Sequence, residues 1–399
     1  MKIVFFTFYY PPDLCAGSFR ASALAQALSK KMANGDELHI ITTHPNRYKE
    51  HSVKAENIEV DGKITIHRIE VPEHNSGMLL QIRTFSVYAV AAYRLCKRLN
   101  PNFLIGTTSR LMTGILTGFS AYRLNCRYFI DLRDIFSETI SDFFSRKSKI
   151  LGNTSRLVFS FLEVRLFDKA AGVNVVSEAF PGYFQEQGVD TSSWSFFSNG
   201  VDKEFINLSL VRRNHSQHIK TILYAGNIGS GQGLDLVIPE IAKQLGSSYH
   251  FVIIGDGGAF LSLSNAIKAK NISNVELLPP VTRLELVKYY LDADIMFLHL
   301  NNVSAFRRVL PSKIFEYIAL RKPIVAGLSG YSAKFLKDHA PYAFLFDPGN
   351  SKAAVSSIVK AVDSKVSEKA VDKFVTKYSR SSIMSQMANK LVYIIESSE

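Results

Sequence analysis

Short apolar runs alternate along the chain with segments in which apolar residues recur every three to four positions. In the first half these runs are short and continuously apolar, which is typical of strands buried on both faces of a parallel sheet. The segments between them, such as Phe19–Met32 and Leu79–Leu99, have helical spacing. The predicted strands are Lys2–Phe8, Glu37–Thr42, Ile64–Ile69, Phe103–Gly106, Arg127–Asp131 and Gly172–Val176.

The alternation stops at a polar stretch, residues 211–220 (VRRNHSQHIK), and then begins again. We therefore predict an α/β fold with two doubly wound parallel-sheet domains, 1–200 and 219–380, joined by a linker at 201–218. A last helix within 381–399 is a candidate to cross back to the first domain. The strands predicted in the second domain are Lys220–Ala225, His250–Ile254, Val275–Leu278, Ile295–Leu298, Pro323–Ala326 and Ala343–Phe346.

The composition narrows the class of protein. Of the 399 residues, 47% are hydrophobic and 21% charged, which excludes low-complexity disorder, collagen and coiled coil. The net charge of +12 favours polyanionic partners such as nucleic acid, anionic lipid or phosphorylated small molecules. The 3 cysteines form neither a disulfide framework nor a metal motif, and no apolar window approaches the ~20 residues of a spanning helix. These features predict a protein of the cytoplasm.

A glycine-rich loop, AGNIGSGQG at 225–233, follows a predicted strand and opens a helix. Glycines allow backbone N–H groups to approach an anion, and a helix N-terminus attracts negative charge. The loop fits neither the P-loop nor the G-x-G-x-x-G pattern. Because a tight strand-to-helix turn needs fewer glycines, we predict phosphate binding here.

A second candidate is the segment LPSKIFEY at 310–317. Pro311 suits the first turn of a helix. Ser312 and Lys313 would then lie at a positive N-terminus, and Glu316, one turn further, would accept hydrogen bonds from a ribose diol. Taken alone, the segment is better explained by a capped helix with a solvated Lys and Glu.

Charged residues also lie at the start of one predicted helix and at the end of one predicted strand in the first half. Arg20 lies in the first turn of a predicted helix, after Gly17 and Ser18, where a cation opposes the helix dipole. We therefore expect an anionic ligand or a carboxylate beside it. Asp131, Arg133 and Asp134 follow a strand, where they face a binding edge or form a buried ion pair of Arg133 with an Asp.

Two stretches combine basic and apolar residues without any acid. Residues 74–130 lack Asp and Glu, and within them 78–99 form a basic amphipathic helix; residues 143–162 mix cations with aromatic residues. This composition fits an interfacial helix on anionic lipid. For 78–99, packing of the apolar face on the sheet is the better explanation, whereas for 143–162 the two explanations are equal.

The order of several motifs resembles the retaining glycosyltransferases of family 4, close to the branch that acts in surface-polysaccharide assembly. The resemblance covers most of the chain and implies the GT-B fold, two Rossmann-like domains facing a central cleft. It implies an acceptor-binding N-terminal domain and a C-terminal domain that binds a nucleotide-sugar. The motifs are YYPPDLCAGSFRASALAQAL, IDLRDIFSE, VNVVSEAF, FFSNGVD, YAGNIGSGQGLD, FVIIGDGG, NVELLPPVTRLELVKYYLDADIMFLHL and LPSKIFEYIALRKPIVAG.

The resemblance also implies roles for residues. Glu316 resembles the second Glu of the family's E-x7-E motif, and we assign Lys313, Glu316 and Arg133 to catalysis. The donor-binding set is Gly226, Asn227, Gly229, Gln232, Gly233, Gly255, Leu278, Pro279, Val281, Arg308, Pro311 and Ser312. The set for acceptor or phosphate binding is Gly17, Ser18, Arg20, Asp131 and Asp134.

The sequence departs from the family pattern at three points. Arg308 stands where the first Glu of E-x7-E is expected, so the donor sugar is in doubt. Asn227 and Gln232 are neutral where the family often has Arg and Lys, and we infer that Lys313, with Arg307 or Arg308, supplies the missing charge. Arg133 stands where many members have His, and a guanidinium cannot act as a base.

The resemblance implies retaining transfer of a hexosyl or N-acetylhexosaminyl group from a nucleotide-sugar, with UDP favoured, and without metal or cofactor. The implied acceptor is a lipid-diphosphate-linked or free saccharide, and the enzyme is expected at an anionic membrane on its cytoplasmic face, in O-antigen or capsule assembly. The alternatives are a GT-B nucleotide-sugar epimerase and a non-catalytic scaffold that binds membrane or a partner transferase. Nucleic-acid binding is suggested only by charge and has no recognisable module here.

Overall fold

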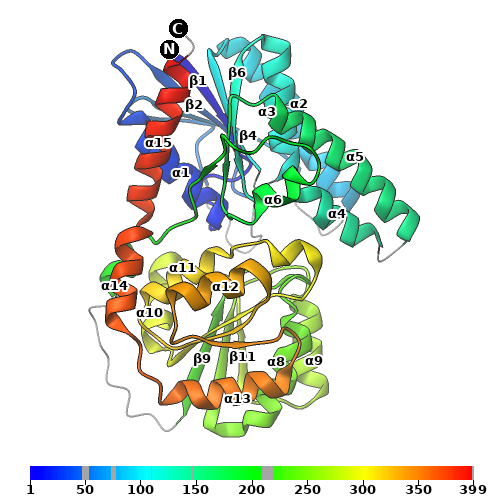
Figure 1. Ribbon diagram of the computed structural model, residues 1–399, viewed down its shortest axis with the longest axis vertical. Helices are drawn as coiled ribbons and strands as arrows, with labels where there is room; N and C mark the ends of the chain where they lie inside the picture. The colour runs from blue at the N-terminus through cyan, green and yellow to red at the C-terminus, as the bar shows by residue number, and fades with distance from the viewer. Residues whose placement is uncertain (47–53, 73–77, 109, 146–147, 209–218, 398–399) are drawn as a thin grey trace. The chain divides into compact units, whose positions relative to one another are not determined.

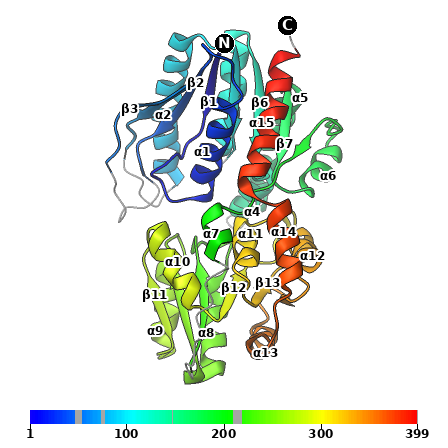
Figure 2. The same cartoon turned by 90° about the vertical axis from the view of Figure 1, so that its left-hand side faces the viewer.

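The computed structural model describes residues 1–46, 54–72, 78–108, 110–145, 148–208 and 219–397. Its contacts divide the chain into two compact units, Met1–Asn199 with Ser381–Glu399 (unit 1) and Gly200–Arg380 (unit 2). Each unit is a parallel sheet with helices on both faces (Figures 1 and 2). The predicted α/β class with two doubly wound sheets is confirmed.

Unit 1 has the sheet order β3-β4-β2-β1-β5-β6-β7-β8. Its pairs are parallel except that of β3 with β4, which a tight turn at Gly62 joins. The apolar runs predicted the buried strands with small shifts at their ends. They missed the two edge strands, β3, where Ile58 and Val60 are exposed, and the short β8. The strands are β1 (Lys2–Phe6), β2 (Glu37–Thr43), β3 (Ile58–Asp61), β4 (Ile64–Ile69), β5 (Phe103–Thr107), β6 (Arg127–Leu132), β7 (Gly172–Val175) and β8 (Ser195–Phe196).

The helices of unit 1 cover both faces of this sheet. Helices α2 and α3 pack on strands β1, β2, β4, β5 and β6, and α3 also contacts α5. The core between helices and sheet is apolar and aromatic, with Phe6, Phe8 and Tyr88 fully buried. The helices are α1 (Ala16–Ser29), α2 (Met78–Leu99), α3 (Leu111–Leu124), α4 (Phe136–Ser145), α5 (Lys149–Asp168), α6 (Phe180–Gln185) and α15 (Arg380–Glu396).

Unit 2 has the all-parallel order β11-β10-β9-β12-β13-β14. Its strands are β9 (Lys220–Ala225), β10 (Tyr249–Ile254), β11 (Val275–Leu278), β12 (Ile295–His299), β13 (Ile324–Gly327) and β14 (Phe344–Phe346). Its helices are α7 (Lys203–Leu208), α8 (Leu234–Leu245), α9 (Phe260–Ala269), α10 (Arg283–Asp292), α11 (Ser312–Ala319), α12 (Gly330–His339), α13 (Ser351–Val362) and α14 (Glu368–Lys377), with short 3-10 turns η1 (Gly246–Ser248) and η2 (Ser304–Arg307). The glycine-rich loop after β9 and the loop between β12 and α11 follow neighbouring strands, so they meet at one edge of this sheet.

The segment predicted as a linker begins inside unit 2. Val201 forms a parallel bridge with Ser379, and the buried ring of Phe205 on α7 meets Tyr290 edge to face at 5.5 Å. The linker residues 209–218 lie outside the described residues. The last helix begins at Arg380, and from Ser381 onward its contacts belong to unit 1.

The basic stretch 143–162 spans a helix break, not one continuous helix. Helix α4 ends at Ser145, and Ser148 begins α5 as an N-cap whose hydroxyl accepts a hydrogen bond from the Leu151 N–H. Arg146 and Lys147, which contribute two of its cations, lie outside the described residues. The described part of the stretch therefore belongs mainly to α5.

Candidate active site

The ammonium of Lys313 lies directly against the glycine-rich loop of unit 2. A Cβ added to Gly226, whose φ is +152°, would come within 2.0 Å of Lys313 Cε and 2.2 Å of Nζ. The positive φ favours glycine, and a larger residue here would displace the end of the Lys313 side chain. Pro311 is the extended N-cap residue of α11 and not part of its first turn, which corrects our prediction, so Ser312 and Lys313 are the first helical residues. The sequence therefore brings a cation and a helix N-terminus to the loop.

Two charged side chains of α11, Lys313 and Glu316, lie at this edge of the sheet. Burial lowers the pKa of Lys313, and the negative charge of Glu316 partly opposes this effect. Glu316 accepts a hydrogen bond of 2.9 Å from the hydroxyl of Tyr290, which is fully buried. Burial holds the pKa of Tyr290 well above its usual value, so this hydroxyl stays protonated and orients the carboxylate.

A further cation acts on Glu316 from the start of α10. Although burial alone would lower the pKa of Arg283, the charges of Asp202 and Glu316 raise it. The guanidinium of Arg283 is paired with Asp202, which also accepts from Arg380. Arg283 and Tyr290 were not among the predicted site residues, because their proximity to Glu316 depends on how α10 packs beside β9.

The neutral residues of the glycine-rich loop bind each other. Asn227 Nδ2 donates to Gln232 Oε1 at 2.9 Å, and the Gly229 N–H donates to the same oxygen at 3.1 Å. The N–H of Gly229 is therefore engaged within the loop, and Asn227 and Gln232 stabilise the loop conformation. The assignment of these three residues to nucleotide-sugar binding stays a prediction.

His299, at the end of β12, is a residue that the sequence analysis missed. Its Nδ1 contacts the Gln232 carbonyl at 2.6 Å, and its Nε2 accepts from the Gly349 N–H at 3.0 Å. These contacts define a neutral imidazole with the proton on Nδ1, and burial lowers the pKa of His299 in agreement. A polar residue that closes the apolar strand IMFLH was the available signal.

Asn301 holds the other half of the glycine-rich loop. Its Nδ2 donates to the Ser230 carbonyl at 2.6 Å, and its main-chain N–H donates to the Gly231 carbonyl at 2.9 Å. A Cβ on Gly233 would come within 2.1 Å of Asn301 Oδ1. The loops after β9 and β12 are thus fastened together, which positions Lys313 over Gly226.

The backbone packing requires a glycine at position 255. A Cβ on this residue would lie 1.8 Å from the Gly226 carbonyl oxygen, and its φ is +148°. Its N–H donates to the Leu278 carbonyl at 3.0 Å, and its assignment to nucleotide-sugar binding stays a prediction. Of the remaining predicted donor residues, Pro279 is exposed, and Val281 and Arg308 are partly exposed.

In unit 1, Arg20 and Asp131 form a buried ion pair. Arg20 is 1% exposed, and its Nε and Nη2 donate to the two carboxylate oxygens of Asp131 at 2.7 and 2.8 Å. Nη1 donates to the Ser198 carbonyl at 2.6 Å, and Asn174 donates to Asp131 at 2.8 Å. The expected carboxylate beside Arg20 is therefore found, and the two side chains bind each other in the core, while their assignment to acceptor or phosphate binding stays a prediction.

The other predicted residues of unit 1, Arg133, Asp134, Gly17 and Ser18, differ in their exposure. Arg133 Nη1 donates to the Ala16 carbonyl at 3.3 Å, and burial, together with the charge of Arg20, lowers the pKa of Arg133. The ion pair expected between Arg133 and an Asp is replaced by that of Arg20 with Asp131. Asp134 is exposed, whereas Gly17 and Ser18 are buried in the first turn of α1.

A buried carboxylate, Glu163 on α5, holds the start of α4. Its Oε1 accepts from the Phe136 N–H at 2.9 Å and its Oε2 from Ser137 Oγ at 2.5 Å; the Tyr183 hydroxyl lies 2.9 Å from the same Oγ. Burial raises the pKa of Glu163 to about 7, although the hydrogen bonds to the carboxylate oppose this shift. Glu163 therefore titrates near neutral pH.

We expect Glu163→Gln to flatten the pH dependence of unfolding. Because the pKa is about 7 in the folded protein against a usual 4.5, folding binds a proton between these values, and the free energy of unfolding falls as the pH rises through this window. The full difference is on the order of 3 kcal/mol at 1.36 kcal/mol per unit. Urea unfolding at pH 5 and pH 8 measures it. Glu186→Gln, at an exposed site, is the control, and parallel pH profiles for wild type and Glu163→Gln would contradict the assignment.

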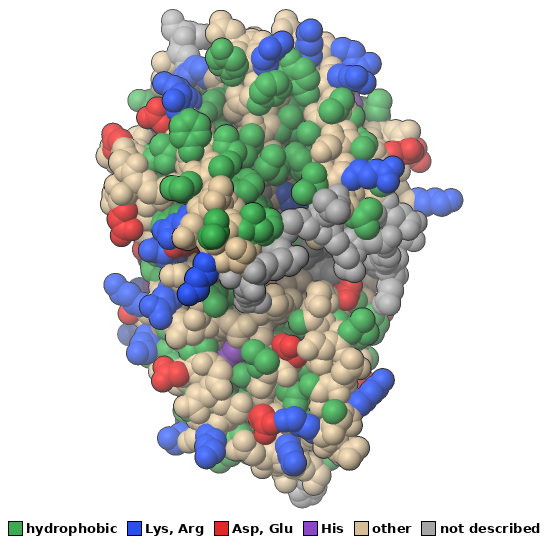
Figure 3. Space-filling model, turned by 90° about the vertical axis from the view of Figure 1, so that its right-hand side faces the viewer, with side chains coloured by type: hydrophobic (Ala, Val, Ile, Leu, Met, Phe, Trp, Pro, Cys, Tyr) green, Lys and Arg blue, Asp and Glu red, His purple; other side chains and the backbone are tan. Residues whose placement is uncertain are grey.

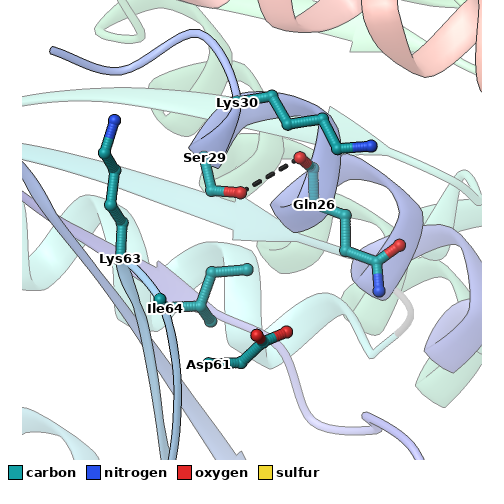
Figure 4. A pocket seen from close by; sticks show the side chains of 7 residues that line it. Gln26, Ser29, Lys30, Asp61, Lys63 and Ile64 are labelled. Atoms are coloured by element: carbon teal, nitrogen blue, oxygen red, sulfur yellow. Dashed lines mark hydrogen bonds between the residues drawn. The ribbon is translucent and has the colours of Figure 1, made fainter.

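A hollow of about 460 Å³ lies at the opposite, amino-terminal edge of the unit 1 sheet. Figure 4 shows it between the end of α1 and the turn from β3 to β4. The residues that line it are Gln26, Ser29, Lys30, Asp61, Gly62, Lys63 and Ile64. Since the Lys63 ammonium donates to the Met32 carbonyl at 2.6 Å, we assign this hollow no part in the candidate site.

Among the residues that the structure describes, no group of three or more His, Cys, Asp or Glu side chains is arranged to hold a metal ion. Within the same residues, every helix is too short or too polar to cross a bilayer.

Known proteins resemble both the sequence and the structure. Residues 211–378 match the family model described as glycosyl transferases group 1. Over 384 residues the chain is 22% identical to the colanic acid biosynthesis glycosyl transferase WcaI of Escherichia coli (strain K12), covering 91% of this chain and 92% of that protein. Sucrose-phosphate synthase from Thermosynechococcus elongatus has a TM-score of 0.73 at 11% identity over 100% of both chains. Anabaena HepE in complex with UDP-glucose has a TM-score of 0.69 at 15% identity over 98% of this chain and 99% of that chain. At these identities the solved structures establish a shared fold.

Proposed function

The chain belongs to the group 1 glycosyltransferases and has the GT-B fold, and we propose that it transfers a sugar from a UDP-sugar to a saccharide in surface-polysaccharide assembly, with retention of configuration. The observation that carries this proposal is the position of Lys313 and Glu316 at the start of α11, against the glycine-rich loop. The relative named for colanic acid biosynthesis supports the pathway class. The Anabaena structure that holds UDP-glucose supports the donor class.

In this proposal unit 2 binds the donor. Glu316 accepts hydrogen bonds from the ribose hydroxyls, and Tyr290 keeps its carboxylate oriented. The diphosphate lies near the Lys313 ammonium and the N-terminus of α11, where two positive potentials add. Because burial lowers the pKa of Lys313, an anion beside it would offset the cost of keeping this side chain charged.

The same groups serve the transfer step. The bond from the anomeric carbon to the diphosphate oxygen breaks, while the acceptor oxygen forms its bond on the same face of the sugar. The acceptor proton passes to the departing phosphate oxygen, so no side chain needs to act as a base. Lys313 stabilises the charge that grows on the leaving group, and this stabilisation is stronger in the transition state than in the bound donor.

The proposed acceptor is a saccharide linked to a lipid diphosphate, presented at a membrane surface. The net charge of +12 supports an anionic partner of this kind. Arg133 remains our candidate for contact with the acceptor or a phosphate, since its guanidinium is partly exposed at the end of β6. Its role is electrostatic because it cannot accept a proton.

We expect Glu316→Ala to weaken UDP-sugar binding by about tenfold to a hundredfold, because hydrogen bonds to a charged group are lost. Thermal shift against UDP-, GDP- and dTDP-sugars first identifies the donor, which stabilises the fold by mass action. Calorimetry then compares Glu316→Ala with wild type and with Glu276→Ala, a change at an exposed carboxylate of the same unit. Unchanged affinity in Glu316→Ala would remove Glu316 from the site. Conversion of the UDP-sugar without acceptor would identify an epimerase instead.

A further inference from the structure

Three helices of unit 1 form a surface that is both apolar and exposed. Helix α3 contacts both α2 and α5, and Figure 1 shows the three helices on the same side of the sheet of unit 1. Large apolar side chains on their outer faces remain in solvent, among them Val90 (52%) on α2, Tyr122 (85%) on α3 and Leu157 (74%) on α5. Large apolar side chains that gather on the surface of a folded protein mark a binding surface.

The exposed residues follow the helical repeat, which separates them from the core. On α5, Ile150, Leu157 and Phe161 recur at intervals of seven and four residues and are exposed, whereas Leu166 faces the core. Helices α2 and α3 turn one face to the sheet, α5 packs on α4 and α3, and the opposite faces carry the exposed side chains. Packing on the sheet, the better explanation of residues 78–99 from sequence, accounts only for the inner face.

The charges on this surface are mainly basic. Residues 74–130 contain no Asp or Glu, and on α5 Glu163 is fully buried, while Asp168, at the end of the helix, is exposed. Arg83 and Arg94 on α2, Arg123 on α3 and Arg156 on α5 are exposed. Figure 3 shows hydrophobic side chains gathered over this face of unit 1, with Lys and Arg around them.

We propose that the outer face of α2, α3 and α5 docks onto a bilayer that contains anionic lipid. Apolar side chains would enter the interface while the arginines meet lipid phosphates. A second copy of the chain fits less well, because a symmetric contact would place basic groups opposite basic groups. Since no described helix is able to cross a bilayer, the helices would lie along its surface. The proposal rests on the proposed function at one point: a lipid-linked acceptor would explain why the protein binds a membrane.

Vesicle flotation of the full-length protein tests this surface. The vesicles are phosphatidylcholine alone and phosphatidylcholine with phosphatidylglycerol, each at low and high salt. We expect wild type to float with the anionic vesicles and to be released by salt. Leu157→Asp should weaken this binding about tenfold or more, because an apolar contact is lost and a repulsive charge is added. Leu261→Asp on α9, equally exposed at 74%, should bind like wild type.

A second variant, Arg156→Glu, reverses one charge of the surface without removing an apolar side chain, and it should reduce binding to anionic vesicles. Equal binding of all variants, or no binding by wild type, would overturn the proposal. A dimer in light scattering that Leu157→Asp dissolves, without vesicle binding, would assign the surface to self-association. Affinity for the UDP-sugar should be unchanged in Leu157→Asp, so a failure of this proposal is distinguishable from a failure of donor binding.

Discussion

Lys313→Ala is expected to lower kcat by about 10²- to 10³-fold while changing donor affinity much less. The reason is the position of the ammonium, whose Nζ would lie 2.2 Å from a Cβ on Gly226, at the start of a loop without any cation of its own. The leaving diphosphate gains charge as the bond to the sugar breaks. A group that stabilises that gain acts mainly on the transition state and therefore on kcat.

Steady-state kinetics with the donor identified by thermal shift provide the measurement. Lys337→Ala, which removes an exposed lysine from α12 of the same unit, should leave kcat unchanged. Thermal midpoints of both variants show whether unit 2 remains folded. An unchanged kcat in Lys313→Ala, or a loss of affinity as large as the loss of kcat, would contradict the inference that Lys313 replaces the missing loop cations.

Arg20→Ala is expected to lower the free energy of unfolding of unit 1 by about 3–5 kcal/mol. The substitution leaves the carboxylate of Asp131 buried without its cation. Although burial alone would raise the pKa of Asp131, the charge and hydrogen bonds of Arg20 lower it, so the carboxylate is ionised in the folded protein. The Ser198 and Phe197 carbonyls also lose the donors that tie their segment to α1.

Chemical denaturation measures this loss, with Arg123→Ala on the exposed face of α3 as the matched arginine control. That control should change stability by no more than about 0.5 kcal/mol. Asp131→Asn should also destabilise, because it leaves the guanidinium buried without a counter-charge. A near-neutral Arg20→Ala variant that loses acceptor binding would instead restore the ligand role first expected for Arg20.

The sequence by itself determined the two-sheet architecture and much of unit 2's candidate site. Continuous apolar runs are local signals, and they predicted the buried strands of both sheets. The loop that begins at Gly226 and the helix that begins at Ser312 are also local, since each depends on glycines or a proline next to a strand or helix end. The family resemblance led us to infer that Lys313 supplies charge to this loop, and the adjacency of β9 and β12 in the sheet brings the two together.

Only the tertiary structure decided which polar groups are used within the protein. Arg20 and Asp131 are 111 residues apart, and nothing local distinguishes a guanidinium that binds a carboxylate from one that awaits a ligand. His299 and Asn301 acquire their roles because β12 lies beside β9 and brings them to the glycine-rich loop. The outer face of α2, α3 and α5 has the same physical origin: helical spacing defines two faces, but the sheet and the neighbouring helices determine which one stays in solvent.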